Sequence, residues 1–224
     1  MIVGLIVAMD TEFALVSKIL EQPEHKSIHH LNFVEGRFGD KRLILMKSGM
    51  GKVNAATAAV ELINNFHPDI LINTGIAGGI DPSLSVMDMV AGQTVVYHDV
   101  WCGEGEYGQV QYLPPIYNGD ASLLKKVSTI HSDITIHLGQ IASGDQFVSE
   151  QSALEAIKDK FPNALAVDME SAAIAQVCYL YHIPYLALRL ISDTPGIENH
   201  YQQYVNFWDK APEKSLEIIE ALLA

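Results

Sequence analysis

The sequence predicts an α/β fold in a single domain, residues 1–224, built around a mixed β-sheet. Residues 2–8 are continuously apolar and lead through a polar turn into a helical pattern, which is typical of the opening βα unit of an α/β sheet. Residues 33–38 and 42–46 flank the turn Gly39-Asp40-Lys41, and this hairpin pattern predicts antiparallel pairing. Strand and helix patterns then alternate to the end of the chain, without repeats or a linker.

The composition narrows the class of protein. Nearly half of the residues are hydrophobic, which suits a large core and is too rich for disorder. No apolar run approaches the roughly 20 residues that span a bilayer, and the amino end lacks a basic leader, so we expect no membrane attachment and no signal peptide. A formal net charge of −13 without a basic patch argues against nucleic-acid binding. Two cysteines make no disulfide framework and indicate a cytoplasmic protein.

The first strand is followed by an acid where open α/β sheets bind their ligands. Glu12 lies just beyond the carboxyl end of that strand, at the start of a helix that carries Leu15, Val16, Ile19 and Leu20. An acid is also ordinary in the first turn of a helix, so the local pattern leaves both interpretations open.

Two glycine-bearing segments each follow a predicted strand. Ser48-Gly49-Met50-Gly51-Lys52 leads into an Ala-rich helix at about 52–65, but it lacks the glycine spacing of a Walker loop. Residues 69–79 predict a buried strand that opens into a glycine-rich turn at Gly75-Ile76-Ala77-Gly78-Gly79. That turn is not the dinucleotide fingerprint and no helix pattern follows it directly. We therefore reject NAD binding, and a backbone cradle for a sugar or a base remains open.

A long loop at 98–115 follows a strand predicted at 86–97. It is rich in glycine and aromatic residues, which is typical of loops that bind a ligand or pack against a partner chain. His98, Asp99 and Cys102 occur in it, but a metal-ligand spacing and a second ligand pair are missing. We expect no metal here.

Residues 166–181 predict the central element of the chain. No residue from Ala172 to Tyr181 is charged and small or apolar side chains occupy every face, so we expect a helix that is buried on all sides. Asp168 and Glu170 stand at its entrance. For Asp168 we favour a helix cap. For Glu170 the pattern alone also favours a cap, although a buried carboxylate needs a partner, and the hydroxyls of a ligand are one candidate.

The remaining predicted elements are a helix at about 120–131, a strand at 134–142, a helix at 150–160, a strand at 184–191 and a closing helix from about 212.

The strand at 184–191 brings a second set of polar residues. Arg189 is embedded among apolar neighbours, where a guanidinium needs an anion or several acceptors. Asp193 follows that strand, and Ser192-Asp193 suits a simple turn as well as a functional acid. With Glu12 and Glu170, these residues are expected on one rim of the sheet. Acids that converge in one cleft are the groups that break glycosidic bonds.

Six short motifs, in order along nearly the whole chain, resemble the bacterial 5′-methylthioadenosine/S-adenosylhomocysteine nucleosidases of the purine nucleoside phosphorylase and uridine phosphorylase superfamily. They are Gly4 to Glu12, Lys47-Ser48-Gly49-Met50-Gly51-Lys52-Val53, Ile72-Asn73-Thr74-Gly75 with Ala77-Gly78-Gly79, Ser143-Gly144-Asp145-Gln146-Phe147, Ala166-Val167-Asp168-Met169-Glu170 and Arg189-Leu190-Ile191-Ser192-Asp193. The resemblance implies a three-layer α/β/α domain with a partly barrel-like sheet. It also implies a homodimer with the 98–115 loop at the interface, a nucleoside as the small-molecule partner, and no cofactor.

The activity that the resemblance implies is hydrolysis of an N-glycosidic bond, which releases adenine and a 5-thio-substituted ribose in methionine salvage. Glu12 matches the residue that positions and deprotonates the attacking water. Asp193 matches the acid that protonates purine N7, which requires a pKa raised by burial or by neighbouring acids. Glu170 matches the acceptor of the ribose hydroxyls.

Binding residues follow from the same resemblance. Met9 and Met169 match residues that pack on the ribose, Phe147 matches one that stacks on the base, and the backbone at Val148 matches one that reads the adenine edge. Gly78 matches a backbone contact. The expected binding set is completed by Met50, Arg189 and Ser192, of which Ser192 supports Asp193.

Some positions depart from the family pattern. Ile76 stands where a serine is usual, and Met50 and Asp168 replace isoleucine and glutamate. The 98–115 loop also differs from its commonest version. Because this loop reaches the neighbouring subunit's thioalkyl pocket in the family, the preference among 5′-substituted adenosines stays open.

Three rival functions remain. A phosphorylase of the same fold would use phosphate instead of water, but such enzymes carry an arginine-bearing turn where this chain has Met9-Asp10-Thr11-Glu12, and a carboxylate repels phosphate. An aminofutalosine-type nucleosidase uses the same chemistry. A non-catalytic nucleoside-binding protein would keep the cavity without needing all of Glu12, Glu170 and Asp193.

Overall fold

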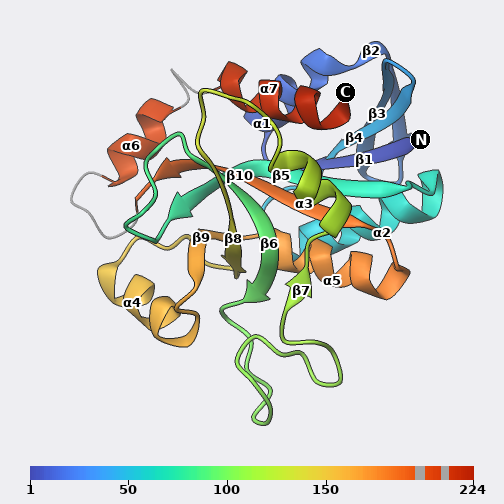
Figure 1. Ribbon diagram of the computed structural model, residues 1–224. Coiled ribbons are helices and arrows are strands. Elements are labelled where there is room, and N and C mark those ends of the chain that lie inside the picture. The colour runs from blue at the N-terminus through green and yellow to red at the C-terminus, as the bar shows by residue number, and fades with distance from the viewer. Residues whose placement is uncertain (195–199, 208–211) are drawn as a thin grey trace.

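The computed structural model of the chain describes residues 1–194, 200–207 and 212–224 (Figure 1). In these ranges the strands are β1 (Ile2–Val7), β2 (Glu21–Ile28), β3 (Leu31–Phe38), β4 (Lys41–Lys47), β5 (Ile70–Gly79), β6 (Met89–Tyr97), β7 (Tyr117–Asn118), β8 (Ile136–Ser143), β9 (Ala164–Asp168) and β10 (Tyr185–Asp193). The helices are α1 (Asp10–Val16), with a 3₁₀ turn at Ser17–Ile19, α2 (Lys52–Phe66), α3 (Ala121–Val127), α4 (Gln151–Lys160), α5 (Ser171–Tyr181), α6 (His200–Phe207) and α7 (Pro212–Leu223). None of these helices is long and apolar enough to cross a membrane.

The strands of the described residues form one mixed sheet, part of which closes on itself. The order is β10-β6-β8-β9-β5-β1-β4-β3-β2, and β10 also pairs with β5. Strands β5, β9, β8, β6 and β10 therefore form a closed barrel, and β1, β4, β3 and β2 extend from it as an open sheet. Parallel pairs such as β1 with β4 stand beside antiparallel pairs such as β3 with β4. The expected mixed, partly barrel-like α/β sheet is confirmed.

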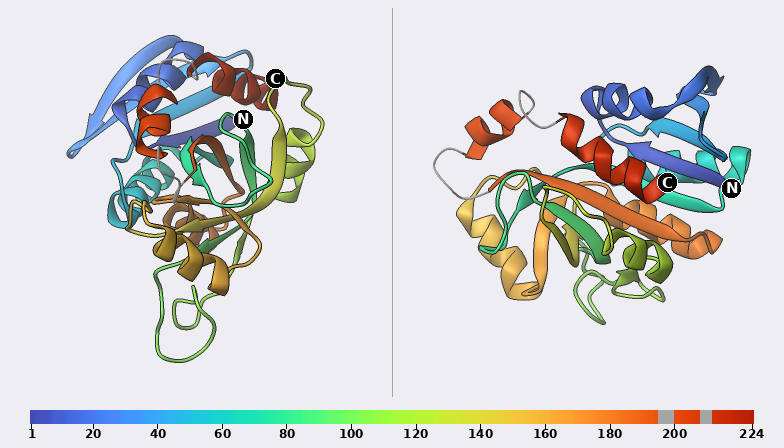
Figure 2. Two further views of the ribbon diagram at one scale, coloured as in Figure 1. Left: turned by 90° about the vertical axis from the view of Figure 1, so that its left-hand side faces the viewer. Right: turned by 45° about the horizontal axis from the view of Figure 1, so that its top comes forward.

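Helices cover both faces of this sheet because its central strands alternate their side chains between two cores. Along β4, Ile44 and Met46 join the core under α2 and α5, whereas Leu43 and Leu45 join the core under α1 and α7. Such alternation is the period of two in an extended chain. A third, smaller core lies between α4 and the barrel. The two views of Figure 2 show the helices on opposite sides of the sheet, which confirms the three-layer arrangement.

Most predicted elements are present, with differences at their ends. The hairpin and the helices expected at about 52–65, 150–160 and from 212 are confirmed. The turn expected at Gly75–Gly79 is wrong, because β5 continues through these glycines and pairs there with β9 and β10. The patterns missed β2, β7, β9 and α6. The single-domain organisation, 1–224, stays a prediction that the continuous sheet supports.

The central helix differs from expectation at its last turn. Ser171 to Ala175 are buried, as predicted, but Tyr179, Leu180 and Tyr181 are between 41% and 52% exposed. The 98–115 loop leaves the end of β6 and projects from the ribbon at the bottom of Figure 1. Both features present apolar surface away from the sheet.

Candidate active site

A cavity lies where β1, β5, β9 and β10 end, with about 620 Å³ of empty space that is partly open to solvent. Carboxyl ends of strands are where α/β sheets gather their ligands. The cavity is lined by Ala8, Met9, Glu12, Met50, Ile76, Ala77, Gly78, Gln146, Phe147, Val148, Val167, Asp168, Met169, Glu170, Ser192, Asp193 and Tyr204. It therefore brings together every predicted site residue except Arg189.

Glu12 is held in place by backbone groups. Its Oε2 accepts hydrogen bonds from the N–H groups of Ala8 and Met9, each at 2.9 Å, and its Oε1 accepts one from Ile76 at 3.1 Å. The side chain is buried, at 5% exposed. Burial raises the pKa of Glu12, while the charge of Arg189 and the three N–H groups act in the opposite direction. This arrangement suits a base that is fixed in position and can exchange a proton.

Glu170 also points into the cavity. Glu170 occupies the N-cap position of α5, but its side chain makes no capping hydrogen bond. The interpretation of Glu170 as a helix cap is therefore wrong. Its Oε1 instead accepts a hydrogen bond from the N–H of Gly51 at 2.9 Å. Burial, followed by the negative charge of Asp168, raises the pKa of Glu170 to about 7. A buried carboxylate at a cavity wall is ready to accept hydrogen bonds from a ligand.

Asp193 is the third acid at the cavity. It ends β10 at 3% exposed, and the Ser192 hydroxyl donates to its Oδ1 at 2.5 Å. The same hydroxyl lies 3.3 Å from the carbonyl oxygen of Ala77 on β5. The predicted support of Asp193 by Ser192 is thus present as a direct contact.

Arg189 does not line the cavity, which corrects the prediction that it contacts the substrate. It is 1% exposed and lies behind the acids, where its Nε and Nη2 are each 2.7 Å from Oδ2 of Asp168. Nη1 and Nη2 also donate to the backbone and side-chain oxygens of Asn73. The predicted need of this guanidinium for an anion and further acceptors is confirmed.

Asp168 does more than the predicted cap. Its carboxylate accepts the Ser171 N–H at 3.2 Å near the start of α5, as a cap would. It also accepts hydrogen bonds from the hydroxyls of Ser143 and Ser171 and pairs with Arg189. The resulting buried ion pair fixes the ends of β8, β9 and β10 relative to each other.

Aromatic and thioether side chains form the apolar wall. Phe147 is half exposed, and its ring meets that of Tyr204 edge-on, with centroids 5.9 Å apart. The Tyr204 hydroxyl lies 3.7 Å from the sulfur of Met9. Tyr204 was missed because it belongs to α6, outside the sequence motifs, and nothing local marks it. Such a wall suits a flat base and an apolar tail.

The metal interpretation of the 98–115 loop gains no support. Asp99 pairs with Lys52 at 2.7 Å, and Cys102 is exposed. Within the described ranges, no group of three or more His, Cys, Asp or Glu side chains is placed to hold a metal ion.

Comparison with known proteins identifies the family of this chain. The family model described as "Phosphorylase superfamily" matches residues 2–224. The chain is 38% identical to a 5′-methylthioadenosine/S-adenosylhomocysteine nucleosidase of Staphylococcus aureus over 226 residues, which covers 99% of each protein.

Solved structures of related proteins also match the fold over nearly the whole chain. The nucleosidase of Colwellia psychrerythraea, in complex with adenine, superposes with a TM-score of 0.95 at 31% identity and covers 100% of this chain and 94% of that one. The Streptococcus pneumoniae nucleosidase, with a transition-state inhibitor, gives 0.94 at 33% identity, covering 100% and 98%. A futalosine hydrolase of Helicobacter pylori reaches 0.92 at 25% identity, covering 99% and 97%. The chain therefore belongs to the 5′-methylthioadenosine/S-adenosylhomocysteine nucleosidase family of the phosphorylase superfamily.

Proposed function

We propose that this protein hydrolyses the N-glycosidic bond of 5′-methylthioadenosine and S-adenosylhomocysteine, releasing adenine and 5-methylthioribose or S-ribosylhomocysteine. The observation that carries the proposal is that Glu12, Glu170 and Asp193, far apart in sequence, line one cavity. Family membership over the full chain supports the same reaction. The reaction needs no cofactor, and its place is the salvage of methionine in the cytoplasm.

Glu12 activates the water. Its carboxylate accepts a proton from a water molecule that attacks the anomeric carbon of the ribose. Three backbone N–H groups fix the carboxylate, so it does not have to reorganise when the proton moves. Departure of the base leaves an oxocarbenium-like cation, which the buried acids stabilise in a site of low dielectric constant.

Asp193 assists the leaving group. Adenine is a poor anion to expel, so a proton delivered to purine N7 lets it depart as a neutral base. The Ser192 hydroxyl, which donates to Oδ1 of Asp193, orients the carboxyl group for this transfer.

The rest of the cavity holds the nucleoside. Glu170 accepts the ribose hydroxyls, and Met9 and Met169 pack against the sugar. Phe147 stacks on the base, the backbone of Val148 reads its edge, and Gly78 supplies a further backbone contact. These roles suit the cavity, because the thioethers of Met9 and Met169 and the ring of Phe147 form part of its wall. Met50, 60% exposed, is at the mouth.

Water rather than phosphate is the proposed nucleophile because the anion-binding groups are already occupied. The free N–H groups at the start of a helix attract anions. Here the N–H groups of Ala8 and Met9, which precede α1, are bound by Oε2 of Glu12. A phosphate would have to displace this carboxylate and would be repelled by it.

The deciding experiment measures release of the free base, adenine or hypoxanthine, from a panel of nucleosides, with and without phosphate. Methylthioadenosine, S-adenosylhomocysteine, aminofutalosine and inosine separate the proposed function from its rivals. We expect adenine from the first two at the same rate in both buffers. A strict need for phosphate, or binding without release of a base, would contradict the proposal.

We further propose that the protein is a homodimer with the 98–115 loop at the interface. Trp101 and Tyr112 in that loop and Tyr179, Leu180 and Tyr181 at the end of α5 expose large apolar surface, which soluble monomers rarely leave open. Sedimentation equilibrium tests this: we expect twice the mass of the chain for wild type, and a shift towards monomer for Tyr179→Glu. A monomeric wild type at micromolar concentration would refute it.

A further inference from the structure

The amino end of α2 holds two segments of the cavity wall at once. The N–H of Gly51 donates to Oε1 of Glu170 at 2.9 Å, and the N–H of the next residue, Lys52, donates to Oδ1 of Asp145 at 2.7 Å. Glu170 faces the ribose in the proposed function, whereas Asp145 stands two residues before Phe147. Two adjacent peptide groups thus support the sugar side and the base side of the cavity.

The side chain of Lys52 ties in a third segment. Its Nζ donates to Oδ2 of Asp99 at 2.7 Å and lies 4.0 Å from Oδ2 of Asp145. The same Oδ2 of Asp99 accepts the backbone N–H of Asp145 at 2.9 Å. Lys52, Asp99 and Asp145, which we call the Lys52 network, therefore connect α2, the start of the 98–115 loop and the base-binding segment 145–148.

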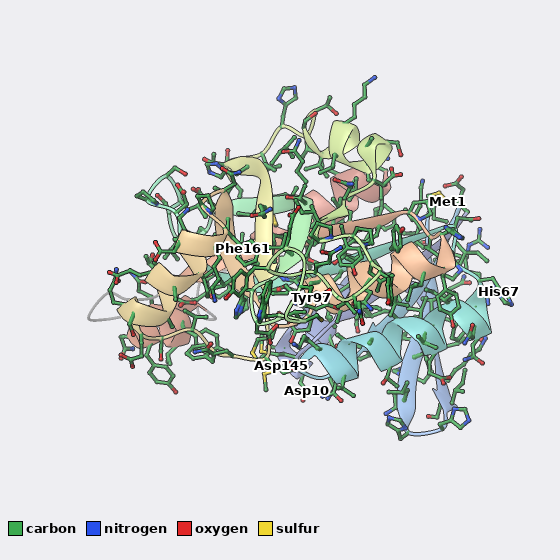
Figure 3. The ribbon with its side chains drawn as sticks, turned by 90° about the horizontal axis from the view of Figure 1, so that it is seen from below. Met1, Asp10, His67, Tyr97, Asp145 and Phe161 are labelled. Atoms are coloured by element: carbon green, nitrogen blue, oxygen red, sulfur yellow. The ribbon has the colours of Figure 1, made fainter. Side chains whose placement is uncertain are left out.

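Two glycines beside the network are closely packed against its side chains. Gly51 has φ of +92°, and a Cβ there would stand 2.9 Å from Oδ1 of Asp145. At Gly144 a Cβ would stand 2.5 Å from the ring of His98 and 2.9 Å from Cγ of Asp99. All three of these distances are shorter than those at which real Cβ atoms contact other atoms. In Figure 3, which views the protein from below, Asp145 lies at one end of α2 and His67 lies at the other end.

We propose that Lys52, Asp99 and Asp145 are positioning residues that fix the base-binding segment relative to Glu170. They do not line the cavity, so they act through the groups they hold. A nucleoside spans both sides of the cavity, and misplacing one side by about 1 Å is enough to cost roughly 100-fold in rate. Free adenine occupies only the base side and is less sensitive. The inference rests on the proposed function, whose roles for Glu170 and Phe147 it extends.

If the Lys52–Asp99 ion pair served only the stability of the fold, its removal would change stability and not catalysis. A partly exposed ion pair contributes about 0–1 kcal/mol to stability and leaves catalysis unchanged. The Lys52 and Asp99 side chains are 24% and 26% exposed, so their stability contribution alone is small. The test must therefore compare catalysis with stability and with adenine binding.

The experiment uses Lys52→Met, Asp99→Asn and their double variant, with Lys52→Arg as the conservative replacement. The control is Lys26→Met, which removes another Lys–carboxylate pair, with Glu35, on the distant β2–β3 hairpin. For each protein one measures kcat and KM for methylthioadenosine, the dissociation constant of adenine by calorimetry, and Tm. If Lys52→Met fails to fold, Asp99→Asn carries the same test.

We expect Lys52→Met and Asp99→Asn each to lower kcat/KM by roughly 10- to 100-fold, with adenine affinity changed by less than about threefold. The kcat/KM of the double variant should be no lower than that of either single variant, and Lys52→Arg should recover most of the activity. Lys26→Met should have the kcat/KM of the wild type. If Lys52→Met and Asp99→Asn fold and keep the wild-type kcat/KM, or if their losses add in the double variant, the proposed positioning role of the Lys52 network is wrong. Inactive wild type would instead overturn the proposed function.

Discussion

The carboxylate of Glu12 rests against the backbone of Gly75, where a Cβ would stand 2.6 Å from Oε1. The next peptide N–H, that of Ile76, donates to the same oxygen. Strand β5 therefore both makes room for the proposed base and orients it. Gly75 has no positive φ, so the space it leaves, rather than backbone freedom, is what makes glycine necessary there.

Gly75→Ala should therefore reduce activity by displacing Glu12. The added methyl group pushes the carboxylate off its three N–H donors, and we expect kcat/KM to fall by about 100-fold or more. Gly39→Ala is the control, because Gly39 has φ of +58° and nothing within 4 Å of its Cβ position. That substitution strains a remote turn by roughly 1–2 kcal/mol without touching the cavity. Equal activity of the two variants in a steady-state adenine assay would contradict this account of Gly75.

Asp193→Asn should remove most turnover while sparing binding. The amide keeps the shape and can still meet the Ser192 hydroxyl, but it has no proton to deliver to N7. We expect kcat to fall by about 10²–10⁴-fold, with adenine affinity nearly unchanged in calorimetry. A 5-thioribosyl substrate with a p-nitrophenolate leaving group, which departs without protonation, should lose far less. An Asp193→Asn enzyme as active as wild type on methylthioadenosine would refute the role.

Glu170→Gln should stabilise the fold above neutral pH. The pKa of Glu170 is raised from 4.5 to about 7, chiefly by burial, so the folded state binds this proton more tightly than the unfolded chain does. That contribution to stability is complete below about pH 4.5 and is lost as the pH rises through about 7. At pH 8 the glutamine variant avoids the buried charge, and we expect it to gain roughly 1–3 kcal/mol in urea unfolding. If the free energies of unfolding of the two proteins differed by the same amount at pH 5 and at pH 8, the raised pKa of Glu170 would be contradicted.

The same titration should be visible in substrate binding. If the ionised Glu170 accepts the ribose hydroxyls, a non-hydrolysable methylthioadenosine analogue should bind more weakly as the pH falls below about 7. Adenine, which lacks the sugar, should show no such step from this group. The step should vanish in Glu170→Gln. A step of the same size for adenine in wild type would assign it to another residue.

Sequence patterns could predict which acids share an edge of the sheet. Glu12 lies just beyond the carboxyl end of one buried strand and Asp193 ends another, and the apolar pattern after Glu170 places that residue at the start of the central helix. The carboxyl ends of parallel strands meet at one edge of a sheet, so the shared edge of Glu12 and Asp193 was predictable. Glu170 was expected beside them because the central helix starts at the same edge. The closure of the barrel was not derivable from any local pattern, because it depends on the pairing of β5 with β10, more than 100 residues apart.

Residues whose role depends on tertiary contacts could not be placed in advance. An arginine among apolar residues must have acceptors, but its sequence neighbours do not say whether it faces a cavity or another side chain. Arg189 faces Asp168 and Asn73. Tyr204 meets Met9 across a separation of 195 residues, and only the folded chain brings them together. The glycines of β5 suggested a turn because glycine is common in turns, whereas Gly75 serves close packing.

Asp168→Asn tests whether the buried ion pair supports the acids of the cavity. The amide can keep a hydrogen bond to Nε of Arg189 but leaves that buried charge, 1% exposed, without its directly paired carboxylate, so we expect a loss of roughly 3–5 kcal/mol in urea unfolding. Because the charge of Asp168 also raises the pKa of Glu170, that pKa should fall in the variant, and the pH step in analogue binding should move to lower pH. Asp81→Asn is the matched control. It removes the partner of Lys158 at a site about one quarter exposed, where we expect less than about 1 kcal/mol and no change in the step. If both variants lost the same stability and the step stayed in place, the ion pair would be an ordinary structural contact with no influence on Glu170.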